Sequence, residues 1–128
     1  MVIDTSVLAA IAFNEPEAAA LRERIADDPI RLISAATVLE AAMVIKTRLG
    51  EAAGADLDLW LYKADVEIVP VTADHADRAR RAWRRYGKGR HPASLNYGDC
   101  FSYALAALTG EPLLYKGNDF SQTDIEAA

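Results

Sequence analysis

Three short apolar runs in the chain end in acidic or turn residues and have the length of β-strands. They span residues 1–4 (MVID), 66–72 (VEIVPVT) and 111–119 (EPLLYKGND). The second run is rich in β-branched residues, which favour strands. Longer segments with helical spacing separate the three runs, and this alternation predicts an α/β sandwich around a mainly parallel sheet.

Six segments have the pattern of helices. Residues 34–50 carry apolar side chains at Val38, Ala42, Ile45 and Leu49, which is the spacing of one helix face. Residues 95–110 are apolar nearly all round, which is typical of a buried helix. The remaining predicted helices span residues 5–13, 15–27, 55–65 and 72–87.

The length and composition predict one domain over residues 1–128, because 52% hydrophobic residues are enough to build a core. No segment has the pattern of a membrane span or of a signal peptide, so we expect a cytoplasmic protein that does not contact a membrane. The single cysteine, Cys100, has no partner for a disulfide and no neighbours at zinc-site spacing. We interpret it as a small buried apolar residue.

The charged residues are unevenly distributed along the chain. A net charge of −5 argues against a nucleic-acid partner, because phosphate neutralisation requires Lys and Arg. However, the segment 78–90 (RARRAWRRYGKGR) holds half of the 14 basic residues and no acidic residue. It is a candidate RNA-binding surface through Arg78, Arg81, Arg84, Arg85, Lys88 and Arg90.

The same segment has a simpler interpretation as a solvated helix face. Its apolar stripe is Ala76, Ala79, Trp83 and Tyr86, with the arginines on the flanks. Trp83 and Tyr86 are then either part of the core or platforms on which bases stack. The two histidines, at positions 75 and 91, are isolated and are interpreted as surface residues.

Four acidic residues stand among apolar neighbours, namely Asp4, Glu40, Asp99 and Asp119. Asp4 and Asp119 end predicted strands, and functional groups gather at the carboxyl ends of parallel strands. If helices bring Glu40 and Asp99 to that edge, the four carboxylates share one pocket. Like charges in one pocket repel one another, and a divalent metal ion relieves this repulsion.

The chemistry of such a pocket favours Mg²⁺ or Mn²⁺, which prefer carboxylate oxygens. A metal held in this way lowers the pKa of a bound water and neutralises charge that develops on a phosphate. The basic segment then has a role, because it would hold a nucleic-acid backbone beside the acids. The pattern therefore indicates a phosphodiester hydrolase.

Each acid also has a local structural interpretation. Asp4 is a possible helix N-cap, and Glu40 matches a capping box with Thr37. Asp99, early in its helix, complements the helix dipole. Asp119 is a possible turn residue in the stretch KGND.

The four acids lie in segments that together resemble the PIN domain family, and within it the VapC-type toxins of bacterial toxin–antitoxin pairs. VIDTSVLAA resembles the first motif of the family, a strand that ends in Asp before Thr or Ser. SAATVLEAAMVI, LNYGDCFSYALA and LLYKGNDFSQTDI are similar to the second, third and fourth motifs. The resemblance covers essentially the whole chain, and the order and spacing of the motifs make it specific.

The resemblance implies a three-layer α/β/α fold and an Mg²⁺- or Mn²⁺-dependent endoribonuclease that cleaves tRNA, rRNA or mRNA. It also implies neutralisation by a cognate antitoxin and assembly as a homodimer. By position in the motifs, Asp4 and Asp99 are implied as direct metal ligands, and Glu40 and Asp119 complete the catalytic acids. The implied supporting residues are Ser6, Asn118 and Asp124.

Two functions without catalysis compete with this one. A regulatory module phosphorylated on Asp would need a switch hydroxyl and a Lys near the pocket, for which Thr72 and Lys116 are loose candidates. A nucleic-acid-binding protein would use the basic face alone. If the chain is a toxin, its antitoxin is expected to lay an apolar helix along the early helices and to place a basic side chain in the acidic pocket.

Overall fold

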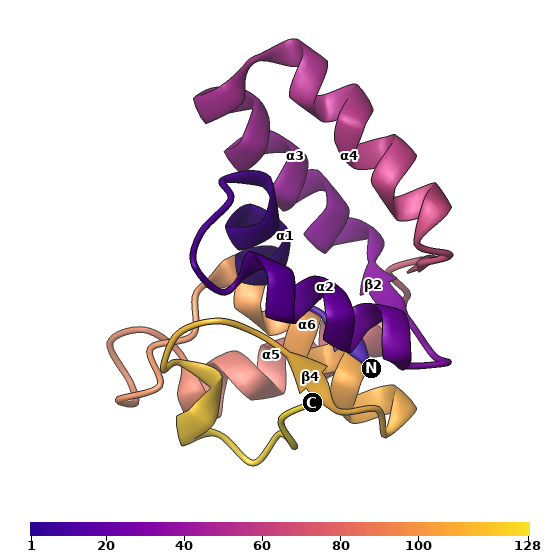
Figure 1. Cartoon of the computed structure of the whole chain (residues 1–128). Coiled ribbons are helices and arrows are strands. Elements are labelled where there is room, and N and C mark those ends of the chain that lie inside the picture. Colours follow the sequence, from indigo (N-terminus) through magenta and orange to yellow (C-terminus); the bar gives the residue numbers. More distant parts are fainter.

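The computed structural model describes residues 1–128 and contains a sheet of four parallel strands with helices on both faces (Figure 1). The spatial order of the strands is β3-β2-β1-β4. The predicted α/β class with a parallel sheet is confirmed. The strands are β1 (Val2–Ile3), β2 (Leu32–Ser34), β3 (Glu67–Val69) and β4 (Leu113–Leu114).

All six predicted helices are present, with shifts at some of their ends. The helix predicted from residue 55 begins at Glu51, directly after Gly50 ends the preceding helix. A short 3₁₀ helix, η1 (Phe120–Gln122), follows β4. The helices are α1 (Thr5–Ala12), α2 (Ala18–Asp27), α3 (Ala35–Leu49), α4 (Glu51–Lys63), α5 (Ala73–Tyr86) and α6 (Tyr97–Thr109).

The strands are where the sequence pattern and the structure differ. Strand β2 is not visible in the pattern, because its three residues run directly into α3, whose N-cap is Ser34. Strand β3 ends before Pro70, which has no N–H to continue the ladder. Strand β4 ends at Leu114, so the expectation that a strand runs to Asp119 is wrong.

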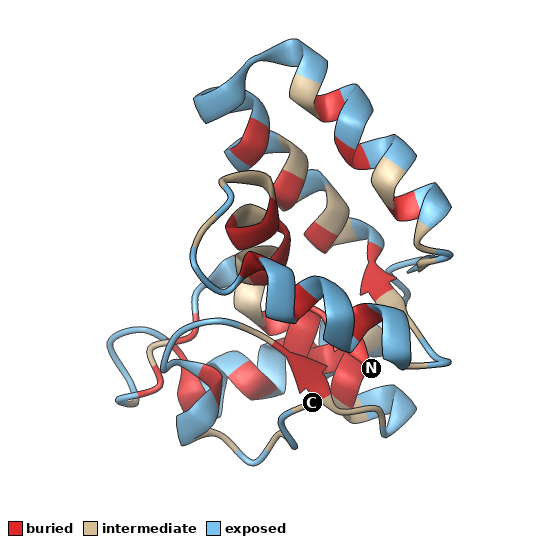
Figure 2. Ribbon diagram, in the orientation of Figure 1, coloured by how far each residue is buried: buried red, intermediate tan, exposed pale blue.

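Strand side chains alternate between two cores, one on each face of the sheet. Ile3, Ile33 and Leu114 pack with α1, α2, α3 and α4, whereas Val2 and Leu113 pack with α5 and α6. Each of these five side chains is at most 1% exposed, and burying one contributes about 1.5–3 kcal/mol. Figure 2 shows this buried centre between exposed outer helix faces. The three-layer α/β/α arrangement is therefore confirmed.

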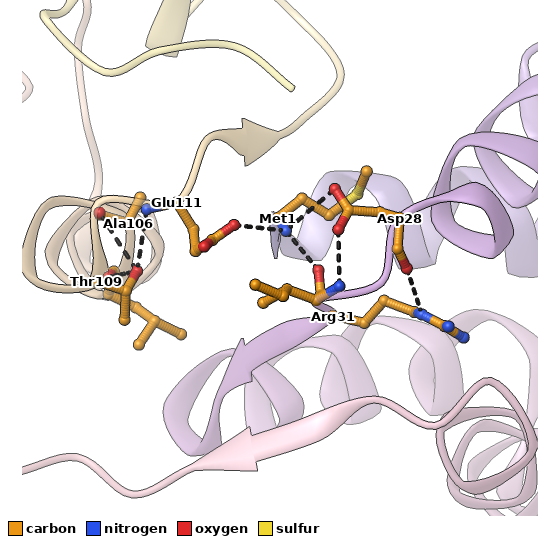
Figure 3. A network of polar contacts seen from close by, with 8 residues as sticks. Met1, Asp28, Arg31, Ala106, Thr109 and Glu111 are labelled. Carbon is orange, nitrogen blue, oxygen red and sulfur yellow. Dashed lines mark hydrogen bonds and ion pairs between the residues drawn. The ribbon is translucent and has the colours of Figure 1, made fainter.

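The amino end of β1 is held by a polar network (Figure 3). The Met1 ammonium group donates to the carboxylates of Asp28 and Glu111 at 3.3 and 3.1 Å. Arg31 Nε in turn donates to the Asp28 carbonyl oxygen at 2.8 Å. These contacts fix the strand whose other end carries Asp4.

Helices α3 and α4 form a hairpin that extends beyond the sheet (Figure 1). They pack on each other through Ile45, Leu57 and Leu61, which belong to the same core as Ile3. None of the helices has the length and apolar character needed to cross a membrane.

Candidate active site

Asp4 lies directly after β1, where it is the N-cap of α1 and only 3% exposed. Its Oδ2 accepts hydrogen bonds from Ser6 N at 3.0 Å and from Ser6 Oγ at 2.7 Å. Its Oδ1 accepts a hydrogen bond from Ser102 Oγ at 2.6 Å. Hydroxyl groups and the positive end of the α1 dipole therefore stabilise the buried carboxylate.

Ser102 is a site residue that the sequence analysis missed. It is fully buried on α6, and its hydroxyl also lies 3.3 Å from Thr37 Oγ1 on α3. The available signal was a hydroxyl three residues after Asp99 within an otherwise apolar helix, which is the spacing of one helix face. Ser102 joins β1, α3 and α6 at the carboxyl edge of the sheet.

Glu40 projects from α3 toward the start of α6. Thr5 Oγ1 donates a hydrogen bond to Glu40 Oε1. A Cβ atom on Gly98 would overlap the Glu40 carboxylate, so only glycine leaves room for it here. The predicted capping box of Thr37 with Glu40 is wrong, because α3 begins one turn earlier.

Asp99 is the third residue of α6 and forms a capping box with Asn96. Its Oδ2 accepts from Asn96 N, and its own N–H donates to Asn96 Oδ1, both at 2.9 Å. Burial raises the pKa of the Asp99 carboxyl to about 7, against the opposing hydrogen bond from Asn96. The negative charges of Asp4, Asp119 and Glu40 raise this pKa further.

The four predicted acids therefore interact electrostatically, and we name Asp4, Glu40, Asp99 and Asp119 the acid cluster. The local interpretation of Asp4 as the N-cap of α1 is also correct, and Asp99 lies in the first turn of α6 as expected, where it forms a capping box in addition. Capping and clustering are compatible because α1 and α6 both begin at the carboxyl edge of the sheet.

Asp119 reaches the cluster from an exposed loop rather than from a strand end. It precedes η1 and makes no side-chain capping bond, and its neighbour Asn118 is exposed too. The loop is tethered near Asp4, because Lys116 N donates to Ser6 Oγ at 3.0 Å. Ser6 thus links the loop to the buried carboxylate.

Asp124 forms its polar contacts with residues of α5 and α6. Its Oδ1 accepts from Tyr103 Oη at 2.6 Å, and its Oδ2 pairs with Arg85 at 3.3 Å. The hydrogen bond from Tyr103 is the main cause that lowers the pKa of Asp124, in contrast to the raised pKa of Asp99. Asp124 therefore anchors the C-terminal segment to α5 and α6.

The side chains suggested for a phosphorylation switch have other contacts. The Lys116 ammonium group pairs with Glu15 and with Glu17, the latter at 3.3 Å. Thr72 is the N-cap of α5 and accepts a hydrogen bond from His75 N. These contacts do not favour the regulatory function.

The donor atoms of the acid cluster suit a hard divalent cation, because they are carboxylate oxygens. None of the four acids forms an ion pair with a basic side chain. No three His, Cys, Asp or Glu side chains converge closely enough to ligate one ion by themselves. Since Mg²⁺ commonly binds one or two carboxylates and keeps several waters, the cluster fits a hydrated ion.

The basic side chains of residues 78–90 are all exposed, on α5 and the loop after it. Arg81 pairs with Asp77 at 2.9 Å, as an i,i+4 pair on the helix. The buried face of α5 consists of Ala79, Ala82 and Tyr86. Of the predicted stripe, Ala79 and Tyr86 are buried as expected, whereas Ala76 and Trp83 are exposed and line a groove between α5 and α6.

The single cysteine and the two histidines are buried or half-buried. Cys100 is buried as predicted, and burial raises the pKa of its thiol to about 11. His75 and His91 are both half-buried rather than fully exposed. The His91 Nδ1 accepts from Ala93 N at 3.0 Å, and its ring contacts Tyr86 edge-on.

Comparisons with known proteins identify the family of the chain. The family model described as PIN domain matches residues 1–126. A Ribonuclease VapC of Mycolicibacterium smegmatis is 60% identical over 127 residues, which cover 99% of this chain and 98% of that protein. Ribonuclease VapC30 of Mycobacterium tuberculosis is 58% identical over 125 residues, covering 98% and 95% of the two chains.

A solved structure is similar over the whole fold. The crystal structure of Mycobacterium tuberculosis VapC20, described as a Sarcin-Ricin loop cleaving toxin, superposes with a TM-score of 0.81. The superposition covers 99% of this chain and 97% of that one, at 20% sequence identity. At this identity the match supports the fold.

Proposed function

The chain belongs to the PIN domain family and to its VapC group, and we propose that it is a metal-dependent endoribonuclease, the toxin of a toxin–antitoxin pair. The observation that carries the proposal is the mutual electrostatic influence of four carboxylates from four separate segments, none of which pairs with a basic side chain. A structural role would not require such repulsion, whereas a metal site does.

Within this proposal, Asp4 and Asp99 would hold an Mg²⁺ or Mn²⁺ ion, and Glu40 and Asp119 would complete the acidic site, directly or through water. The bound metal supplies Lewis-acid activation of water and neutralises charge on the scissile phosphate. Thr5 holds Glu40 in place by its hydrogen bond. The hydroxyls of Ser6 and Ser102 fix both oxygens of Asp4, and Asn118 is proposed as a further polar support.

The exposed basic side chains on α5 and the following loop are proposed to bind the RNA backbone. Two of the predicted contacts, Arg81 and Arg85, are already paired with Asp77 and Asp124. The others make no ion pair and have full charge available for phosphates. These are Arg78, Arg84, Lys88 and Arg90.

Metal dependence is the direct test of the proposal. We expect the purified protein to cleave a labelled RNA pool when Mg²⁺ or Mn²⁺ is added and to stop when EDTA removes the metal. Glu40→Gln, purified identically, is expected to cleave at least about 100-fold more slowly, because it loses one carboxylate charge beside the metal. The 5′ and 3′ ends of the products, read by sequencing, identify the target.

Two results would contradict the ribonuclease proposal. Equal cleavage by wild type, by Glu40→Gln and in EDTA would reveal a contaminating nuclease. No cleavage of any RNA in the pool, together with retained RNA binding, would favour the nucleic-acid-binding function. Cytoplasmic location and homodimer formation stay predictions from the sequence.

We also propose where the antitoxin binds. An apolar groove of about 260 Å³ lies between α1, α3 and α4. Leu8, Ile45, Leu49 and Trp60 are among its lining residues. A groove of this kind suits the apolar face of a helix, which agrees with the expected antitoxin helix.

A matched pair of substitutions tests this docking site. Leu49, which lines the groove, and Leu59, which does not, are 48% and 51% exposed. We expect Leu49→Asp to retain RNA cleavage. Its inhibition is expected to need at least about tenfold more antitoxin than inhibition of wild type, because the substitution buries a charge in the interface. The antitoxin for this titration is the protein that co-purifies with wild type. Equal inhibition of Leu49→Asp and Leu59→Asp would place the antitoxin elsewhere.

A further inference from the structure

A second groove, of about 440 Å³, lies between α5 and α6. Three aromatic side chains, Trp83, Tyr97 and Phe101, line it together with Arg80. Trp83 is 43% exposed and Tyr97 is 81% exposed, although both are large aromatic residues. Tyr97 and Phe101 contact each other edge-to-face, with ring centroids 5.0 Å apart. The groove therefore presents aromatic surface that the fold itself does not bury.

Positive charge surrounds this aromatic groove. The Arg90 guanidinium carbon lies 4.1 Å from the centroid of the Trp83 ring, a cation–π contact. Five basic residues of the segment 78–90 have no carboxylate partner. They are Arg78, Arg80, Arg84, Lys88 and Arg90.

The groove and the acid cluster both adjoin the first turn of α6. Tyr97 and Cys100 line the groove, while Gly98 and Asp99 lie between them in the chain and face the cluster. The first turn of α6 thus separates the two sites.

We propose that this groove holds one unstacked base of the RNA substrate, with Trp83 and Tyr97 as the stacking surfaces and the unpaired cations on the adjacent phosphates. The inference rests on the proposed ribonuclease function and adds a requirement for an unpaired nucleotide beside the cleavage site. Aromatic rings next to a basic surface are the usual means of holding single-stranded nucleic acid. A base inside a duplex has both faces covered and cannot enter.

The test is RNA binding by fluorescence anisotropy, in an Asp99→Asn background with Mg²⁺ to prevent cleavage. The ligand is a short labelled single-stranded oligoribonucleotide. We expect Trp83→Leu and Tyr97→Leu each to weaken binding about tenfold or more, because stacking of one base contributes a factor of roughly 5 to 150. Tyr62→Leu, which removes an 83% exposed tyrosine on α4, is the matched control and is expected to bind normally.

Two further measurements separate stacking from charge. An oligoribonucleotide with abasic positions is expected to bind wild type and Tyr97→Leu equally, since it offers no base to stack. Arg80→Gln is expected to lower the slope of log affinity against log salt by about 1, whereas Tyr97→Leu leaves the slope unchanged.

The proposal is overturned if Trp83→Leu and Tyr97→Leu bind the RNA as Tyr62→Leu does. A shift of these two variants toward monomer in sedimentation, with unchanged RNA binding, would show that a second copy of the chain covers the groove. Failure of the ribonuclease proposal gives a different result. If only the ribonuclease proposal fails, wild type cleaves no RNA in the metal assay. Tyr97→Leu would then still bind the single-stranded oligoribonucleotide more weakly than wild type, because the groove would still hold a base.

Discussion

Asp99→Asn is expected to abolish RNA cleavage and, in the same protein, to raise the melting temperature of the metal-free form. Cleavage falls roughly 10³-fold, because loss of a metal ligand removes several kcal/mol of transition-state stabilisation. Stability rises because the substitution removes one charge from the acid cluster, where burial and the charges of Asp4, Asp119 and Glu40 raise the pKa of Asp99 to about 7. Cleavage assays and thermal melts in EDTA measure the two effects.

The size and pH dependence of the stabilisation follow from the raised pKa. Asp99 is partly exposed, so solvent screening reduces the repulsion, and we expect a gain of about 1–2 kcal/mol, or roughly 4–8 °C. The folded protein binds the Asp99 proton more tightly than the unfolded chain does. Repulsion is therefore absent below about pH 4 and grows as the pH rises to about 7, and the stabilisation by asparagine grows over the same range.

Asp124→Asn provides the control, because the same chemical change is expected to lower the melting temperature. Tyr103 and Arg85 favour the charged form of Asp124 and lower its pKa. Its contribution to stability is present above the unfolded pKa and is lost as the pH falls through the lower folded value. If Asp99→Asn lowered the melting temperature as Asp124→Asn is expected to do, the acid cluster would not be a site of net repulsion.

Gly98→Ala is expected to lower RNA cleavage by about 100-fold or more while the protein stays folded. The added methyl group would occupy the position of the Glu40 carboxylate and force this side chain off its hydrogen bond with Thr5. The displaced carboxylate is flexible, so the fold is preserved. A shift of about 1 Å in a catalytic group is enough for a 100-fold loss. Cleavage rates and circular dichroism report the two properties.

Gly54→Ala is the matched control for this substitution. Gly54 is also a helical glycine, and its added methyl group would meet the end of the flexible Lys46 side chain in the α3–α4 hairpin. We expect normal cleavage, and the alanine raises stability by up to about 1 kcal/mol through its helix propensity. Full activity of Gly98→Ala would mean that Glu40 does not act from the position it has in this structure.

The helices and the alternation of elements could be predicted from the sequence because they depend on local rules. The spacing of Val38, Ala42 and Ile45 is a property of one segment and of the helix repeat. The same locality explains the failures. Strand β2 has only three residues, which is too short to show a period. Strand β4 pairs only through Leu113 and Leu114, and the sequence pattern does not reveal where this pairing ends before Asp119.

The sequence by itself determined the four candidate acids, because Asp4, Glu40 and Asp99 stand among apolar residues and Asp119 follows an apolar run. Only the tertiary structure decided how they are held: Ser102 donates to Asp4 across 98 positions of the chain, and Gly98 gives room to Glu40 from another helix. It also placed Asp124 in contact with Tyr103 and Arg85 and left Trp83 exposed in a groove. Burial and helix period depend on residues that are close in the sequence, whereas a contact between distant segments depends on how whole helices and strands pack.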